Sequence, residues 1–389
     1  MKLRKCARLL LVLTPLLAGC GNFWAPPSGS SGSGTTSTTL SSGYFYVINQ
    51  ETSQIVAYDI NSGALNQIGA YTLAAAPAAI AIAPKGSFLY VSTLAGIYLY
   101  SIGSGGALTV GNSGGVVSSD PASAIAVDTS GSWLVDAVQG TSGVTLNATP
   151  ITSTGTYTGG TVGTQSFSNT SAAVHQMVIS SDDDNVFVAL GNGGTIVDPF
   201  ASANANPLGS NATLIGVANT GGSALSVAVD PSLRLFYIGE SLASGGTTGG
   251  LRVFNYSSLG GTLTQAAGSP IASGGGAPDS ILPISSGDYV YVANGTGLTS
   301  TGNITGFSIT STNGAYTVAK NSTVTAGVQP CHLAEDSNAN FVLSTCAGGS
   351  PDLEAYIFDT TTAGQLDSTL TSTTGTDPTQ AVSVAAVAP

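Results

Sequence analysis

The sequence predicts an all-β domain arranged as a seven-bladed β-propeller, preceded by an export signal and a short tether. From residue 44 onward, runs of alternating β-branched and aromatic residues recur between clusters of Gly, Ser, Thr and Asn, without sustained helical periodicity. The runs repeat at intervals of 44 to 55 residues, the length of one four-stranded propeller blade. The last run has the pattern of a first strand, but no second or third strand follows it. We therefore expect it to complete the blade that begins at residue 44.

The first twenty residues predict a lipoprotein export signal. Basic residues at positions 2, 4, 5 and 8 precede an apolar run from Leu9 to Leu17. This run is too short to cross a bilayer core, which needs roughly 20 apolar residues. It ends in Leu-Ala-Gly-Cys, which resembles the lipobox of bacterial lipoproteins, where the signal is cleaved before the cysteine and the cysteine is acylated. Residues 1–19 are therefore the expected signal peptide and Cys20 the expected lipidation site; the alternative is a secreted protein whose Cys20 pairs elsewhere.

The segment 20–43 is the expected tether, because Gly, Ser, Thr and Pro dominate it and leave almost nothing to bury. Its mean span should be roughly 25 Å. We expect the domain to lie in the cell envelope, lipid-anchored and periplasmic or surface-exposed, and at the outer membrane if the cell is Gram-negative. Gly21 follows the cysteine, so retention at the inner membrane is not indicated.

The charge balance narrows the possible partners. After the signal, the only cations are Lys85, Arg234, Arg252 and Lys320, against 20 Asp and Glu residues. Without a basic stripe, nucleic acid and anionic membrane surfaces are poor partners, so we expect membrane contact only through the Cys20 lipid. The same scarcity disfavours a phosphorylated substrate.

The propeller, residues 44–389, is read from three recurrent elements. A small-apolar first strand follows an anchor at Pro77, Pro121, Ala173, Ser223, Pro278, Pro330 and Pro378, and a second strand such as FLYVS or YVYVAN follows after a turn. A third strand then ends in a Gly-x-Leu or Gly-x-Tyr turn at Gly63, Gly106, Gly155, Gly261, Gly314 and Gly364. A β-helix coil is shorter than this repeat, and membrane-barrel strands are longer than these strands.

Cys331 and Cys346 are placed symmetrically about the turn at residues 337–340. In a hairpin of that register they lie opposite each other, and export supplies an oxidising compartment, so a structural disulfide is expected. A free nucleophilic thiol is the alternative, although the sequence places no base beside either sulfur.

Both histidines, His175 and His332, stand two residues past their anchors, so they should face one mouth of the central channel. There they could act as general bases, with Glu240 as a third catalytic candidate. The ends of second strands should share this mouth and supply ligand-binding residues, namely Asn49, Glu51, Asn294 and Thr345. The alternative is that each histidine is only a hydrogen-bonded polar residue at the narrow end of a strand.

No cofactor or metal site is expected. Asp182, Asp183 and Asp184 occupy a hairpin turn, which turn chemistry explains better than calcium does. No zinc spacing, Gly-rich nucleotide loop or Gly-x-Ser-x-Gly motif is present.

Two segments carry a family resemblance. SAAVHQMVISSDDDNVFVALGNGGTI from Ser171 and QPCHLAEDSNANFVLSTC from Gln329 resemble the Pro-His, Ser-Pro-Asp-Gly and Pro-Arg-His segments of the lactonase family of seven-bladed propellers, which includes 6-phosphogluconolactonase and YVTN-repeat proteins. The resemblance spans residues 44–389 and places both histidines on the family's histidines. The chain departs from the pattern at Cys331, where the family has arginine, at Cys346 and Ala347, where it has Asn-Glu, and at Ala189, near its usual Asp.

These departures remove groups expected to bind phosphate and to assist hydrolysis. We therefore expect a cell-envelope lipoprotein whose propeller is a binding or structural module, with a neutral carbohydrate or another envelope protein as partner at the channel mouth. Lactone hydrolysis on a carbohydrate lactone, with His175 or His332 as the base, is the alternative.

Overall fold

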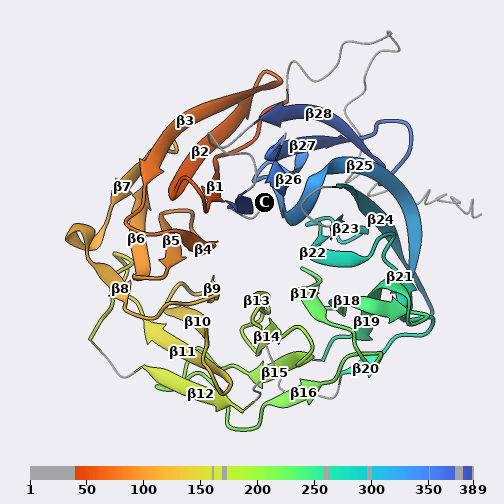
Figure 1. The fold of residues 1–389 in the computed structure, drawn as a ribbon, viewed down its shortest axis with the longest axis horizontal. Coiled ribbons are helices and arrows are strands. Elements are labelled where there is room, and N and C mark those ends of the chain that lie inside the picture. The colour runs from red at the N-terminus through yellow and green to blue at the C-terminus, as the bar shows by residue number, and fades with distance from the viewer. Residues whose placement is uncertain are drawn as a thin grey trace, which may run out of the picture. The chain divides into compact units, whose positions relative to one another are not determined.

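The computed structural model describes residues 40–159, 162–168, 173–257, 263–295, 300–349, 351–372 and 380–387. The signal, Cys20, most of the tether and the turn glycine Gly261 lie outside these residues. Within the unit Thr35–Pro389, antiparallel strands form seven blades around a central axis (Figure 1). No helix in the described ranges has the length and apolar character that a membrane span requires.

The first four blades, counted from Pro77, follow the predicted order of strands from the centre outward. Blade 1 contains β4 (Pro77–Ile82), β5 (Phe88–Thr93), β6 (Gly96–Ile102) and β7 (Leu108–Val110); a 3-10 turn (Asn112–Gly114) leads to β8 (Val116–Ser118), which also pairs with β6. Blade 2 contains β9 (Ala124–Val127), β10 (Trp133–Gln139), β11 (Val144–Pro150) and β12 (Gly163–Phe167). Blade 3 contains β13 (Gln176–Ile179), β14 (Asn185–Ala189), β15 (Thr195–Pro199) and β16 (Thr213–Ile215). Blade 4 contains β17 (Ala224–Val229), β18 (Leu235–Ser244), β19 (Thr248–Asn255) and β20 (Thr264–Gln265), and β21 (Ile271–Ala272) pairs with β19.

Blades 5 and 6 share one long strand, which the sequence did not indicate. β25 (Ala315–Glu335) pairs with β24 over Ala315–Val328 and with β26 over Val328–Glu335, so it is the outer strand of blade 5 and the inner strand of blade 6. The other strands of blade 5 are β22 (Ala277–Pro283), β23 (Tyr289–Gly295) and β24 (Thr301–Thr312). Those of blade 6 are β26 (Phe341–Gly349), β27 (Leu353–Phe358) and β28 (Leu366–Ser372).

Blade 7 closes the ring with both ends of the domain, as the sequence predicts. β29 (Ala381–Ala386) pairs antiparallel with β1 (Phe45–Asn49), which pairs with β2 (Gln54–Asn61) and then β3 (Ala64–Thr72). The pair Val47 and Val384 lies at the middle of this clasp. Figure 1 shows the C-terminal strand at the centre beside β1. The closure leaves β1 without an open edge, which protects the sheet from pairing with other chains.

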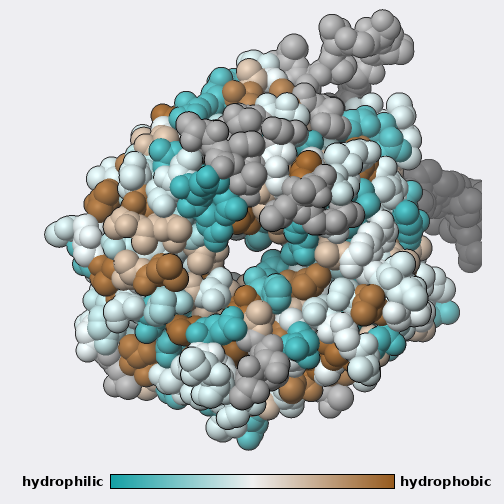
Figure 2. Space-filling model, viewed as in Figure 1, coloured by the Kyte–Doolittle hydropathy of each residue, from teal (hydrophilic) through white to brown (hydrophobic). Residues whose placement is uncertain are grey.

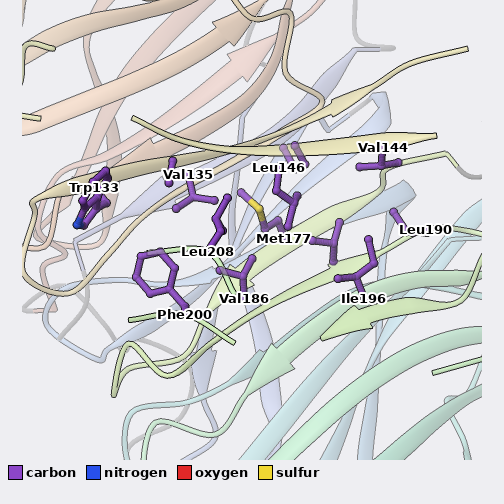
Figure 3. Close-up of a cluster of buried hydrophobic side chains, with 14 residues drawn as sticks. Trp133, Val135, Val144, Leu146, Met177, Val186, Leu190, Ile196, Phe200 and Leu208 are labelled. Carbon is purple, nitrogen blue, oxygen red and sulfur yellow. The ribbon is translucent and has the colours of Figure 1, made fainter. Parts of the chain in front are cut away.

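Seven hydrophobic clusters hold the blades together, and each cluster draws on two neighbouring blades. Figure 3 shows the cluster between blades 2 and 3, where Val135 and Leu146 pack against Val186 and Ile196. The alternating sequence pattern explains this arrangement. Successive side chains of a strand point to opposite faces of its sheet, so each face presents apolar side chains to one neighbouring blade.

A repeated hydrogen bond explains the Gly-x-Leu/Tyr turns. A second-strand tyrosine of one blade donates to the turn glycine of the next blade; the pairs are Tyr46 to Gly106 (2.9 Å), Tyr90 to Gly155 (2.8 Å) and Tyr291 to Gly364 (3.0 Å). All three glycines have left-handed backbones, and a Cβ on Gly106 would lie 2.5 Å from the Tyr44 ring. In blade 3, which lacks the turn, Trp133 Nε1 of blade 2 donates instead to the Ser202 carbonyl.

Candidate functional site

The centre of the ring contains a cavity of about 570 Å³. Residues from the first strands of all seven blades line it, and Figure 2 shows the hollow between them. Most lining residues are Ala, Val or Ile, in agreement with the small-apolar first strands read from the sequence. The cavity is therefore an apolar channel with a few polar groups at defined positions, which is a common form of ligand site.

A β-bulge near the start of the first strand recurs in five blades. The extra residues, which the pairing with the second strand skips, are Ala78, Leu225, Asp279, Cys331 and Val382. Four of these residues, all but Leu225, line the cavity. Bulges re-aim side chains and are frequent beside functional sites, so this device turns Asp279 and Cys331 toward the channel.

Asp279 is an acidic residue of the cavity that the sequence pattern did not indicate. Burial raises the pKa of its carboxyl to about 7, although a hydrogen bond from the Gly295 backbone opposes part of the rise. Gln329 Nε2 donates to Asp279 Oδ2 at 3.3 Å. The one available signal was positional, because Asp279 follows its anchor proline as Cys331 follows Pro330.

His332 lies on the strand next to Asp279. The next residues along the two strands are hydrogen-bonded to each other, because the Leu333 N–H donates to Ser280 Oγ at 3.1 Å. This bond links the first strands of blades 5 and 6. Burial lowers the pKa of His332 to about 4, with a smaller opposing effect from the Val384 backbone, so the ring is neutral at pH 7. Its Nδ1 atom is buried without a hydrogen-bond partner among the described residues.

His175 lines the same cavity from blade 3, so the structure brings both histidines to one channel. Its backbone N–H donates to the Ala189 carbonyl at 3.0 Å just before β13 begins. Solvent reaches the ring from within the channel, while the surrounding protein desolvates it and lowers its pKa. A Cβ on Gly191 would lie 3.1 Å from His175 Nε2, so the ring packs closely against this turn.

The residues predicted at the ends of second strands do not line the cavity, which corrects the shared-mouth prediction for them. Asn49 is buried and its Oδ1 accepts the Thr52 N–H, and Thr345 is buried beside Cys331. Glu51 is an exposed turn residue. The physical reason is that second strands form the next layer outward, so their polar ends bond to neighbouring loops.

Glu240 and Asn294 are also held in this second layer. The Glu240 carboxylate pairs with Arg252 Nη1 at 2.6 Å and accepts the Ala218 N–H at 2.8 Å. The Asn294 amide donates to the Ser273 carbonyl at 2.9 Å. These contacts give both side chains structural roles, and Glu240 is removed from the catalytic candidates.

The two cysteines are free thiols, which corrects the predicted disulfide. The bulge places Pro330 opposite Cys346, so Cys331 is the unpaired extra residue rather than its cross-strand partner. Cys331 Sγ donates to the Ala381 carbonyl at 3.3 Å, whereas Cys346 Sγ donates to the Glu354 carboxylate at 3.6 Å. Burial raises the pKa of the Cys331 thiol to about 12, so it is no activated nucleophile.

The described residues contain no group of three or more His, Cys, Asp or Glu side chains that could hold a metal ion. In the Asp182–Asp184 turn, Asp183 accepts hydrogen bonds from the Thr129 backbone and hydroxyl, and Asp182 accepts one from the Tyr256 hydroxyl. The turn of blade 3 therefore bonds to blades 2 and 4, which gives these acids a structural use.

Glu335 and Gln176 also line the channel, and the sequence pattern indicated neither of them. Glu335 ends β25, and its carboxylate accepts the Ser285 N–H at 2.7 Å and the Ser285 hydroxyl at 3.1 Å. Gln176 lines the channel beside His175, and its Oε1 accepts the Val227 N–H at 3.1 Å. None of the four cations of the described domain lines the cavity.

A family model for the seven-bladed β-propeller lactonases matches residues 34–206 and 236–383. The chain belongs to the lactonase family. No curated protein sequence matches it. Among solved structures, this lactonase-family chain is similar to a periplasmic gluconolactonase of Pseudomonas aeruginosa, with 17% identity, a TM-score of 0.66, and coverage of 88% of this chain and 98% of that one.

Two structures described as putative 6-phosphogluconolactonases are similar to the same degree. The Bacteroides uniformis protein has 18% identity and a TM-score of 0.64, and the alignment covers 85% of this chain and 96% of that one. The Bacteroides fragilis protein has 17% identity and a TM-score of 0.66, with coverage of 90% and 99%. At such identities the likeness establishes the propeller fold that this lactonase-family chain shares with them.

Proposed function

We propose that this lactonase-family propeller is a lipid-anchored protein of the cell envelope whose channel binds an uncharged, hydroxyl-rich ligand such as a neutral carbohydrate. The observation that carries the proposal is the composition of the cavity, which combines apolar walls with two carboxyls, two imidazoles and one amide but no cation. Hydroxyl groups can donate to Asp279 and to the neutral imidazoles, whereas a phosphate would find no counter-charge.

The envelope location rests on the sequence and on one relative. The basic start, the apolar run and the Leu-Ala-Gly-Cys ending support export and lipidation at Cys20. The Pseudomonas aeruginosa gluconolactonase of the same fold is described as periplasmic. A small ligand is favoured over an envelope protein as occupant because the polar groups of the site lie inside the channel.

The experiment uses the purified full-length protein in detergent, with isothermal titration against glucose, glucono-δ-lactone and 6-phosphogluconate. We expect heat from at least one neutral probe and none from the phosphorylated one. Tighter binding of 6-phosphogluconate would contradict the proposal. Mass spectrometry of the same preparation tests the anchor, because a lipidated mature chain begins at Cys20.

Hydrolysis of an unphosphorylated lactone is a second candidate, and the Asp279 carboxyl with its pKa near 7 favours it. The carboxylate would take a proton from water, the hydroxide would attack the lactone carbonyl, and the ring C–O bond would break. The proton would then pass to the leaving alkoxide to give the hydroxy acid. A pH-stat assay on glucono-δ-lactone decides between the two candidate functions. Turnover by the wild type that is lost in His332→Ala or Asp279→Asn would favour hydrolysis. Binding without turnover would favour a binding protein.

A further inference from the structure

Asp279 differs from the other aspartates of the inner strands in what its carboxyl does. Asp128 and Asp336 stand at the opposite ends of their strands and accept backbone N–H groups of the following turn, for example from Trp133 at 2.7 Å. Those contacts close hairpins. Asp279 is instead the extra residue of a bulge that lines the cavity, where no hairpin needs it.

The neighbouring strand is shaped to receive this carboxylate. A Cβ on Gly295 would lie 2.2 Å from Asp279 Oδ2, so any other residue there would displace the carboxyl group. Gly295 is the last residue of β23 and pairs with Ala277. A glycine at this position lets the carboxyl group approach the backbone closely.

Gln329 supplies the second half of the support. Its backbone has φ of 53°, a left-handed conformation that is uncommon for a residue with a side chain. In this conformation its amide reaches Asp279 Oδ2, and the same amide nitrogen lies 3.2 Å from the position of a Gly295 Cβ. Backbone strain that serves to place a side chain beside a cavity is typical of functional sites.

The groups that face Asp279 leave it without a counter-ion. From β25 these are the Gln329 amide and the Cys331 thiol, and the His332 and His175 rings line the same cavity. No Lys or Arg of the described ranges belongs to the lining. A carboxylate that accepts only one side-chain amide and one backbone N–H keeps acceptor capacity for a ligand.

We propose that Asp279 is the ligand-binding carboxyl of the channel and that Gln329 is its positioning residue, so that the ligand is recognised through a hydroxyl donor. This inference rests on the proposed function and names the contact at the same site. It also assigns the ligand class, because an anion would be repelled and the neutral imidazoles that line the same cavity can accept hydroxyls as well.

The test compares Asp279→Asn with Glu335→Gln, a matched change in the same cavity at the other end of the channel. Titrations of the full-length protein in detergent use glucose and glucono-δ-lactone. We expect Asp279→Asn to weaken the wild-type affinity by about tenfold or more, and Glu335→Gln to change it less than about twofold. Equal affinities for wild type and Asp279→Asn would overturn the inference while leaving the proposed function intact.

The pH profile tests the positioning role. Because the Asp279 pKa is about 7, wild-type affinity should rise as pH increases from 6 to 8. Gln329→Ala removes a donor to the carboxylate, so its profile should move to higher pH, a shift that a purely structural residue would not produce. A wild-type profile that is flat over this range would contradict the inference even if Asp279→Asn failed to fold. If glucosamine binds more tightly than glucose, the ligand is a cation and the assigned class is wrong.

Failure of the two proposals can be told apart. If neither neutral probe binds the wild type, the proposed function itself fails. If a probe binds with an affinity that depends on Glu335 and not on Asp279, only the assignment of the contact fails.

Discussion

The Tyr46 hydroxyl of blade 7 donates to the Gly106 carbonyl of blade 1, across the interface where the first complete blade meets the clasp. Burial raises the pKa of this hydroxyl, so it stays protonated as a donor. An equivalent hydrogen bond occurs at two other blade interfaces, so this contact between neighbouring blades is repeated in the ring. In blade 4 the pattern fails, because the buried Tyr237 hydroxyl has no partner among the described residues.

Tyr46→Phe should therefore cost stability, whereas Tyr237→Phe should not. Loss of the Tyr46 hydrogen bond leaves the Gly106 carbonyl without its donor and should lower the free energy of unfolding by about 1 kcal/mol. Tyr237→Phe removes a hydroxyl that is already unpaired, so we expect no loss or a small gain. Urea unfolding followed by tryptophan fluorescence compares the two; equal losses would contradict the assignment.

The sequence predicted the blades well because their signals are local. Anchors, β-alternation and turn glycines each depend on a few neighbouring residues, and seven copies reinforce one another. The clasp was predicted from counting alone, since the chain begins on a second strand and ends on a first strand. The shared strand β25 was missed because its two halves have the patterns of two ordinary strands, and only the pairing of Val328 on both sides shows the continuity.

The site was predicted less well than the fold. Both histidines line the channel, each at the equivalent position of its repeat. Asp279 was missed and Cys331 was mispaired for one reason: a bulge adds a residue to one strand without any clear residue signature, and it changes which side chains face each other. Glu240 was chosen because its strand ends at the mouth, but its partner Arg252 is brought close only by the fold.

Asp198→Asn should stabilise the protein above pH 7. Neither carboxyl oxygen of Asp198 has a hydrogen-bond partner in the described structure, and burial raises its pKa to about 7. The nearby Gly209 N–H, which donates to Pro199, offsets little of this. Between about pH 4 and 7 the folded protein keeps a proton that the unfolded chain releases, so stability falls as pH rises through this window.

The asparagine variant lacks this loss, so its advantage should grow from pH 5 to pH 8 and reach about 1 to 3 kcal/mol. Denaturant midpoints at the two pH values measure it. Asp359→Asn is the control, because Asp359 is only partly buried and its pKa is lowered by hydrogen bonds with Thr361 and Thr362. A constant difference between wild type and Asp198→Asn across this range would show that Asp198 is already ionised in the folded protein.

Glu240→Ala should unfold the protein more readily than most single changes. It leaves the Arg252 guanidinium, which is only 8% exposed, without its counter-ion, at a cost of about 3 to 5 kcal/mol. The double variant Glu240→Ala with Arg252→Leu removes both charges and should recover part of the loss. Thermal unfolding of the three proteins tests this, and a double variant no more stable than Glu240→Ala would argue against a buried pair.

Reducing agents should not change the stability of the propeller. Cys331 and Cys346 are free thiols, so unfolding midpoints with and without dithiothreitol should agree. Alkylation after denaturation without reductant should modify both cysteines, as mass spectrometry of the peptides would show. Detection of the two peptides linked through their sulfurs would show that the cysteines form a disulfide.

The clasp also determines when folding of the domain can be completed. β1 is among the first segments of the domain to be made, yet its inner partner β29 is among the last, so its inner edge waits through the synthesis of all the intervening blades. A ring of this design cannot mature progressively from its N-terminus. Its final closure is a long-range event, which favours slow assembly.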